Sequence, residues 1–572
     1  MNKLFGNKKI GWIVLLVALV LVNVLASLLH VRADLTEEKR YSLSAPTKEL
    51  LRGLDSTVQI DVLLEGDDLP AVVRRFRNAV GEFLFEAKQY GGNKVQFRFI
   101  NPYADASDTA ATRRLEDSLQ YYYGLNAVLF NAPEKVGDEL EVKKLVHGAV
   151  VRYGDKAVGV DFLKGARSFG TEAEQLAALY NNVEASLEYN FGSAIQKVTA
   201  KKKPTVAYML GNGESWGPTV DDAVRTLFTN YYADTLNIRE FPYIPKQIDA
   251  LVFVKPTIPF SDAEKLKIDQ YVMNGGKVLW MVDNMYAEFD SLYKSNGFVA
   301  YDRGLNLEDL LFNYGVRINQ SLLQDMQADQ LPQVSGEGQG QQQRFVSWPF
   351  FPILNGTNHP ISKNLDGVRS MFPTTLDTVA ASGVAKTFLL HSSNNARVLP
   401  APAKIDFTFL QIAPEEKEFT QRQVPVAVLL EGDFRSLYTG RVPRAVADSL
   451  AAAGMPVKYK VGGNNKIIVV ADGDIAMNQY SQFSGPLPMG QNLFTQYTFA
   501  NKDFFLNSLE YLVNPSNILQ TRAKEFSLRL LDPRRVKAEQ TTWQLVNVAL
   551  PIALMILFGF VYQQLRKRKY AR

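Results

Sequence analysis

Acidic and glycine-rich turns after predicted strands are where this sequence has the residue types for chemistry. Open α/β sheets bind ligands at the carboxyl ends of their strands, so residues that follow a buried strand pattern are the first candidates. Glycines there let a ligand approach the backbone, and carboxylates can bind hydroxyls or cations. The candidate ligand-binding residues are Gly211, Gly213, Glu214, Asp283, Asp472 and Asp474.

Each of these turns also has a purely structural explanation. Gly211-Asn212-Gly213-Glu214 lacks the G-x-G-x-x-G pattern and the Lys-Ser/Thr pair of phosphate-binding loops. Asp472-Gly473-Asp474 has two carboxylates that suit a hard cation, but the sequence near them supplies no third acidic ligand, and Asp-Gly is a common turn. We therefore predict no metal centre and no cofactor.

Nucleophilic catalysis has little support in the residue inventory. The chain has no cysteine, four histidines without ligand spacing, and no serine in a G-x-S-x-G turn. We predict no catalytic residues and a protein that is not an enzyme. Two alternatives stay open: a periplasmic enzyme that uses the carboxylates of Glu214, Asp283, Asp472 and Asp474, and a structural scaffold of the cell envelope.

Alternating hydrophobic and helical patterns predict a first α/β domain over residues 36–200. Strand patterns at 58–64 and 95–100 flank a helical stripe over 70–90, which predicts a parallel pair with a right-handed crossover. A hairpin is expected over 149–162, followed by a helix over 182–198. The run Lys201-Lys202-Lys203-Pro204 is interpreted as the linker that ends this domain.

A second α/β domain is predicted over residues 204–520, with a mostly parallel sheet that has helices on both faces. Its expected strands, and the helix that closes it, follow short apolar runs, and Ser261 with Glu264 forms a capping box at the start of another helix. Residues 324–344 are rich in glutamine and are predicted to form an inserted loop. The expected strands lie at 205–210, 237–241, 250–255, 277–283, 424–430 and 466–471, and the closing helix spans residues 504–512.

Two apolar runs at the ends of the chain are each long enough to cross a membrane as a helix. The first covers residues 10–30 and the second 543–562. Bases before the first run (in residues 1–9) and after the second (in residues 563–572) place both tips in the cytoplasm by the positive-inside bias. The bulk of the chain is then periplasmic, on an inner-membrane protein with two spans. The alternative for the first run is a cleaved signal peptide.

Several residues near these runs are candidates for contact with membrane or partner helices. Residues 521–542 form a basic connector ahead of the second run. Contact with phosphate headgroups or with a neighbouring acidic protein is as good an explanation for it as a simple linker. The net charge is +4, and eight of the bases lie in the two tips, so the remainder is mildly acidic and does not favour nucleic acid. The candidate contact residues are Asn23, Arg534, Arg535, Trp543, Pro551 and Gly559.

Segments along the whole chain resemble one family, the gliding-motility-associated ABC transporter substrate-binding protein (G component) of Bacteroidota. Among those that carry the resemblance are RYSLSAPTKELLRGLD (40–55), LEYNFGSAIQKV (187–198), IDQYVMNGGKVLWMVD (268–283), VPVAVLLEGDF (424–434), IIVVADGDIAMNQ (467–479) and NKDFFLNSLEYLV (501–513).

The resemblance implies a membrane-anchored auxiliary subunit that works with an ATPase subunit and a separate ABC permease. It also implies that the second domain is related to the class I amidotransferase-like fold. The sequence departs from those enzymes because no cysteine is present to act as nucleophile. Expected partners are therefore the permease, the ATPase, the lipid bilayer and envelope proteins of the periplasm, in gliding motility or envelope transport.

Overall fold

The computed structural model divides the chain into two units, Met1–Glu525 and Phe526–Arg572. The residues that it describes are 42–66, 69–104, 108–136, 139–163, 172–295, 297–335, 342–412, 414–452, 454–514 and 533–570, with the single residues 20, 518 and 521. The predicted first apolar span therefore lies outside the described residues, apart from Val20.

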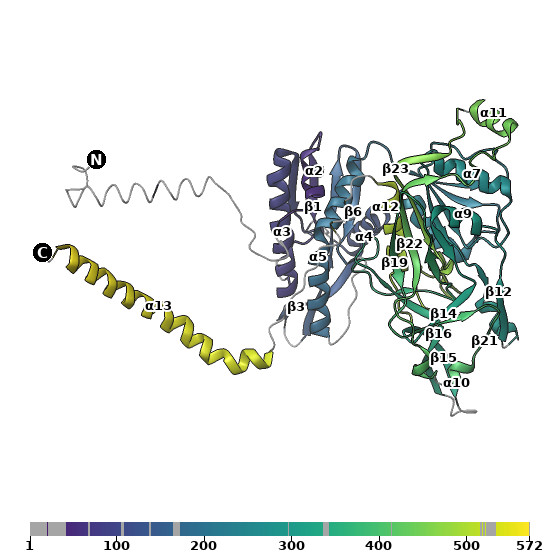
Figure 1. Cartoon of the computed structure of the whole chain (residues 1–572). Coiled ribbons are helices and arrows are strands. Elements are labelled where there is room, and N and C mark those ends of the chain that lie inside the picture. Colours follow the sequence, from purple (N-terminus) through teal and green to yellow (C-terminus); the bar gives the residue numbers. More distant parts are fainter. Residues whose placement is uncertain are drawn as a thin grey trace. The chain divides into compact units, whose positions relative to one another are not determined.

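The N-terminal body of the first unit is built on a four-stranded sheet of order β2-β1-β5-β6. Strands β1 and β2 are parallel and joined through α3, and β5 and β6 form an antiparallel hairpin, both as the sequence predicted. β5 also pairs antiparallel with β1, a pairing that the sequence did not predict. Helices α3 and α5 pack against each other (Figure 1). The elements are α2 Ala45–Arg52, β1 Val58–Val62, α3 Ala71–Gly91, β2 Val95–Phe99, α4 Thr109–Tyr123, β3 Ala127–Val136, β4 Glu139–Val146, β5 Gly148–Tyr153, β6 Lys156–Asp161 and α5 Glu172–Thr199.

The second body is built on a ten-stranded sheet whose main path is β15-β16-β19-β22-β23-β10-β9-β7-β8. The parallel strands β7, β8, β9, β10 and β23 have the order 2-1-3-4-5 of a doubly wound fold. The elements that build or flank this part are β7 Thr205–Leu210, α6 Asp221–Asn230, β8 Tyr232–Asn237, β9 Ala250–Val254, α7 Asp262–Met273, β10 Lys277–Met281, β22 Pro425–Arg435, α11 Arg444–Ala452, β23 Lys460–Val470 and α12 Asn501–Val513.

The rest of this body is antiparallel, which corrects the expectation of a mostly parallel sheet. β22 runs antiparallel to β23, and β19, β16 and β15 continue in alternating directions. These and the smaller elements are β11 Met285–Tyr286, α8 Phe289–Ser295, β12 Gly297–Asp302, α9 Glu308–Tyr314, β13 Val316–Ile318, β14 Ser321–Asp325, β15 Ala328–Ser335, β16 Gln342–Gly356, β17 Val368–Arg369, β18 Leu376–Thr378, β19 Val384–His391, β20 Ala396–Pro400, β21 Ala403–Asp406, α10 Thr408–Gln411, β24 Tyr480–Ser481 and β25 Gly485–Pro486.

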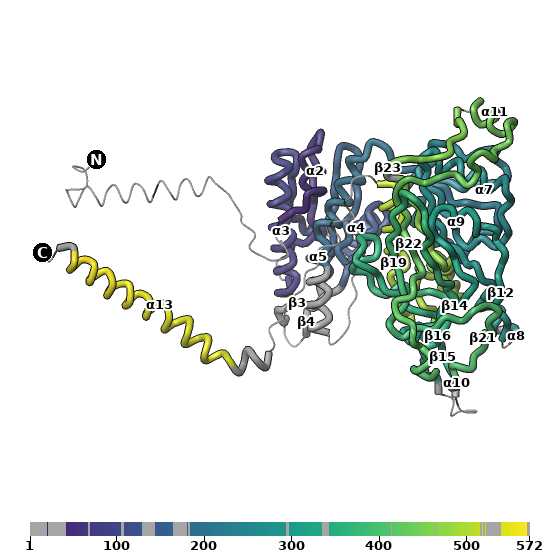
Figure 2. The backbone as a smooth tube through the Cα atoms, in the orientation of Figure 1, coloured from purple at the N-terminus to yellow at the C-terminus, as the bar shows by residue number. Residues whose placement is uncertain are grey.

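Two further sequence predictions for the second body were wrong. Residues 324–344 are not simply a loop, because β15 and the start of β16 form an antiparallel hairpin there, beside α10 (Figure 2). The strand expected over 237–241 is instead β8, which ends at Asn237. β8 is the edge strand of the sheet and is largely exposed, so it lacks a strong apolar pattern.

The core of the second body lies on both faces of the parallel strands. Successive strand residues point to opposite faces, and every residue of β9 is buried, so both faces are covered. Phe253 and Trp280 stack at the centre with ring centroids 4.0 Å apart, and Phe260 packs edge-on against Trp280 at 5.7 Å. The predicted capping box is confirmed at the start of α7, with Glu264 N donating to Ser261 Oγ at 3.3 Å.

The second unit contains helix α13, Pro533–Tyr570. Among the described residues, Glu539–Arg568 is the one helical stretch long and apolar enough to cross a membrane, and it contains the predicted span 543–562. Trp543, Pro551 and Gly559 lie on this helix. Arg534 and Arg535 lie in its first turn, and Asn23 lies outside the described residues.

We expect Trp280→Ala to lower the free energy of unfolding by about 3–5 kcal/mol, because it removes a fully buried ring from the centre of the core. Phe483→Ala is the matched control, since this side chain is 100% exposed and its loss should change stability by less than about 0.5 kcal/mol. Urea unfolding monitored by circular dichroism measures both. Equal urea midpoints of unfolding for the two variants would contradict the placement of Trp280 in the core.

Candidate functional site

The candidate site lies where β7, β9, β10 and β23 end at the same edge of the sheet. In a sheet of this order the topological switch point falls between β7 and β9, and ligands of such folds bind there. The turn after β7 carries Gly211 to Glu214, the turn after β9 begins at Lys255, Asp283 follows β10, and Asp472 to Asp474 follow β23.

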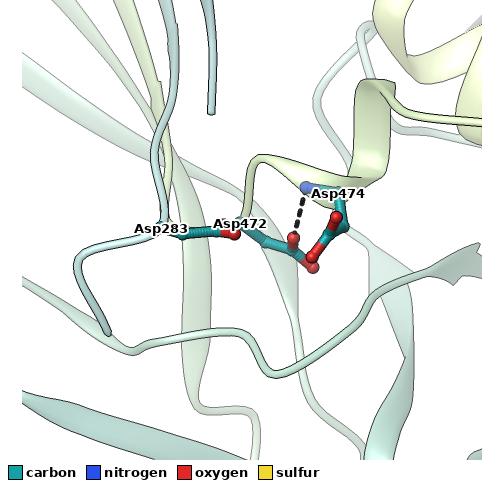
Figure 3. Close-up of side chains that lie close together, drawn as sticks. All are labelled: Asp283, Asp472 and Asp474. Carbon is teal, nitrogen blue, oxygen red and sulfur yellow. Dashed lines mark hydrogen bonds between the residues drawn. The ribbon is translucent and has the colours of Figure 1, made fainter. Parts of the chain in front are cut away.

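Three of the predicted residues, Asp283, Asp472 and Asp474, are brought together (Figure 3). One carboxylate oxygen from each lies within 4.8 Å of the other two, and all three side chains are buried. Asp283 is the third acidic group that inspection of the sequence around Asp472 did not find. Asp474 N donates to Asp472 Oδ1 at 2.7 Å, which fixes the turn after β23.

Lys255, which the sequence analysis missed, supplies the positive charge for these carboxylates. Its Nζ atom lies 2.7 Å from Asp474 Oδ1, 3.1 Å from Asp283 Oδ2 and 3.1 Å from Glu288 Oε2. Arg303 binds the other oxygen of Glu288. Lys255, Asp283, Glu288, Asp472 and Asp474 are named here the lysine–carboxylate cluster.

Lys255 is held in an uncommon backbone conformation. Its φ angle is +50°, in the left-handed region that costs a non-glycine residue conformational energy. Gly473 lies against it, and a Cβ atom at Gly473 would stand 2.7 Å from Lys255 Cβ. The close packing and the ion pairs together hold the ammonium among the three carboxylates.

The charge states in the cluster follow from burial and from the neighbouring charges. Burial alone would lower the pKa of Lys255, but the attraction of Asp474, Asp283 and Glu288 outweighs it and holds the pKa well above its usual value. Burial and the nearby carboxylates Asp283 and Asp474 raise the pKa of Asp472. The ammonium of Lys255 is therefore stabilised in its charged form, whereas burial and the neighbouring carboxylates disfavour ionisation of Asp472.

These carboxylates fit the protein's own lysine ammonium better than they fit a bound metal ion. A divalent metal ion needs several oxygen ligands around one open position. Here the ammonium of Lys255 lies among the carboxylates of Asp283, Asp474 and Glu288. Asp472 Oδ2 accepts hydrogen bonds from Ser370 Oγ and Met371 N, so the remaining carboxylate also has protein partners.

The loop Gly211 to Glu214 forms a separate group beside the cluster. Gly211 and Gly213 have φ angles of +119° and +74°, and a Cβ atom at Gly213 would stand 2.2 Å from Thr257 Oγ1. Thr257 N and Ile258 N donate to Asn212 O at 2.9 and 2.8 Å, so this turn is bonded to the turn after β9. At the switch point, the two loops are thus packed against each other.

Glu214 is a buried carboxyl group that forms no ion pair with the described residues. Its Oε2 atom accepts from Asn212 N at 2.8 Å, whereas Oε1 is buried without a hydrogen-bond partner. Burial raises the pKa of Glu214 to about 7, against smaller lowering effects of backbone hydrogen bonds and Arg239. Arg239 itself binds Glu264, with Nε 2.9 Å from Oε1.

Comparison with known proteins gives the chain a family. The model of the family described as "ABC-type uncharacterized transport system" matches residues 203–508, more than half of the chain, and the chain belongs to this family. A model of a domain of unknown function matches residues 37–152. No curated protein matches the chain. The family and the apolar helix in α13 together support association with a membrane and with other components of a transport system.

Solved structures give only weak likenesses. The mmIFT52 N-terminal domain is 13% identical, with a TM-score of 0.30, over 54% of this chain and 97% of its own. A ThuA-like protein from Parabacteroides merdae is 13% identical, with a TM-score of 0.25, over 55% of this chain and 91% of its own. At these scores neither likeness carries an argument about fold or function.

Lys255→Met should destabilise the protein by about 3–5 kcal/mol, because the carboxylates of Asp283, Asp474 and Glu288 lose their buried counter-charge. Lys404→Met is the matched control: the Lys404 side chain is 75% exposed, and its ion pair with Asp406 should contribute less than about 1 kcal/mol. Thermal unfolding at pH 7 compares the two. Equal stability of both variants would refute the structural role of Lys255.

Glu214→Gln should make the protein more stable at pH 8 and leave it nearly unchanged at pH 4.5. The folded pKa of Glu214, about 7, lies above the ordinary value of 4.5, so the wild type loses stability as pH rises from 4.5 through 7. The gain at pH 8 should be on the order of 2–3 kcal/mol. Chemical unfolding at both pH values measures this gain. A gain that does not depend on pH would contradict a buried Glu214 carboxyl group with a raised pKa.

Proposed function

We propose that this protein is a non-enzymatic auxiliary subunit of an ABC transporter, anchored in the inner membrane and associated with gliding motility or envelope transport. The family match over residues 203–508 is the observation that carries the transport role. The sequence has no P-loop, so the ATPase must be another subunit.

The lysine–carboxylate cluster supports the non-enzymatic part of the proposal. A lysine nucleophile must be deprotonated, but Lys255 keeps its proton because three carboxylates surround it. A carboxylate base needs a free oxygen within reach of substrate. In the cluster, Asp283, Asp474 and Glu288 are paired with Lys255, and Asp472 is buried and hydrogen-bonded.

The proposal includes a membrane topology and a division into domains. Segments 10–30 and 543–562 would cross the inner membrane, with both tips in the cytoplasm and the bulk of the chain in the periplasm. The apolar helix Glu539–Arg568 supports the second span. Separate sheets and hydrophobic cores on the two sides of residues 201–204 support the domains 36–200 and 204–520. The class I amidotransferase-like fold for the second domain remains part of the proposal.

A carboxylate-dependent enzyme is the second candidate, because three aspartates do converge at the carboxyl edge of the sheet. It requires that Asp283, Asp472 or Asp474 contact a substrate, and that Gly211, Gly213 and Glu214 line the same site. Replacing Asp283 and Asp474 by asparagine separates the two candidates. In folded variants, the auxiliary-subunit proposal requires transport in the native organism to continue, whereas the enzyme candidate requires it to be lost.

The direct test of the proposed function is purification of the tagged full-length protein from native membranes in mild detergent. We expect a multispan permease and a P-loop ATPase in fixed ratio, identified by mass spectrometry. A variant in which residues 546–561 are replaced by leucine should lose these partners if the span itself binds the permease. Recovery of the protein alone, or with structural envelope proteins only, would refute the transporter assignment.

A further inference from the structure

Helix α5 makes three sets of contacts within the first unit, through three separate stripes of side chains. Residues three and four apart lie on one face of a helix, so each stripe can be assigned from its spacing. The first stripe belongs to the core of the N-terminal body, where all of its members are buried: Val183, Leu187, Phe191, Ile195 and Val198.

The second stripe faces the second body. Tyr189 Oη donates to Glu510 Oε2 at 2.8 Å, and Ser193 Oγ lies 3.5 Å from Glu510 Oε1. One turn further along, Lys197 Nζ donates to Asn230 Oδ1 at 3.2 Å. Glu510 belongs to α12, which packs on β9, β10 and β23, so this stripe binds the helix that covers the parallel strands.

The third stripe holds the two chain segments that lead toward the predicted spans. Ser44 N, at the start of α2, donates to Glu188 Oε1 at 2.6 Å. Gly192 follows one turn later, and a Cβ atom there would stand 3.3 Å from Ile518 Cγ2 and 4.0 Å from Thr47 Oγ1. Ile518 is 1% exposed, so this residue, which follows α12 in the sequence, is buried beside α5.

We propose that α5 is a rigid strut that couples the two α/β bodies and both membrane-directed segments into one mechanical unit. Each partner binds a different stripe. The Glu510 carboxylate accepts the hydrogen bonds from Tyr189 and Ser193 that join α5 to the second body. Movement of the segments that hold Ser44 and Ile518 would then pass through α5 to the parallel sheet, without a flexible hinge at residues 201–204. The inference is independent of the transport role.

Double electron–electron resonance, which measures distances between spin labels, tests on the full-length chain in nanodiscs whether α5 holds the two bodies rigidly together. The sequence has no cysteine, so the introduced pair Tyr121→Cys and Phe312→Cys gives one label on each body without background, and both positions are exposed. We expect one narrow distance distribution. A broad or bimodal distribution in the otherwise unchanged chain would overturn the proposal.

Removing the hydrogen bonds to Glu510 should let the second body move relative to the N-terminal body. In the variant Tyr189→Phe, Ser193→Ala, Glu510→Leu we expect the distribution to broaden at least twofold, and an unchanged width would overturn the proposal. A pair within the second body, Tyr232→Cys and Phe312→Cys, must stay narrow to show that this body is folded. If it does not, Glu510→Ala alone decides: this change removes the acceptor of both Tyr189 and Ser193, and the proposal requires it to broaden the distribution between the bodies.

Discussion

The arrangement at the carboxyl edge of the second sheet depends on the ion pairs of one buried lysine. Lys255 joins the ends of three parallel strands, because its partners Asp474 and Asp283 follow β23 and β10, and Lys255 itself follows β9. Three buried carboxylates at this edge would repel one another and lose hydration, and an ammonium among them offsets both effects. Through Glu288 and Arg303 the same network reaches the β11–β12 segment.

This constraint gives a doubly wound fold with an edge that is closed by its own residues. At the switch point, Thr257 N and Ile258 N donate hydrogen bonds to Asn212 O, so the two turns there bind each other. The ammonium of Lys255 lies between the carboxylates. Folds of this order host many functions, and the function is decided by the site. Here the candidate site residues bind one another at the ends of β9, β10 and β23.

The sequence predicted the central elements well because their patterns are strong. β1, β2, β7 and β9 are short apolar or alternating runs, and the capping box of α7 is visible in Ser261 and Glu264. β8 and β15 were missed for a physical reason: both lie at the edges of the sheet, where polar residues such as glutamine are tolerated and the apolar pattern weakens.

The candidate site was predictable only in part. Asp283, Asp472 and Asp474 were identified because each lies at the end of a predicted strand or just after one. Their meeting, however, depends on strand order: Asp283 accepts a hydrogen bond from the N–H of Gly473, 190 positions later in the sequence. Lys255 carried the same signal, a charged residue at the end of a predicted apolar strand. Its φ angle and its triple pairing are properties of the fold alone.

Titration of Mn²⁺ into the purified full-length protein, followed by electron paramagnetic resonance of the free ion, tests the central claim most directly. If Lys255 is the counter-charge of the carboxylates, the wild-type protein binds no Mn²⁺ at the cluster, and Asp283→Asn and Asp474→Asn leave the titration unchanged. Stoichiometric binding that is lost in both variants would contradict the account, since it would show that a metal ion displaces the ammonium.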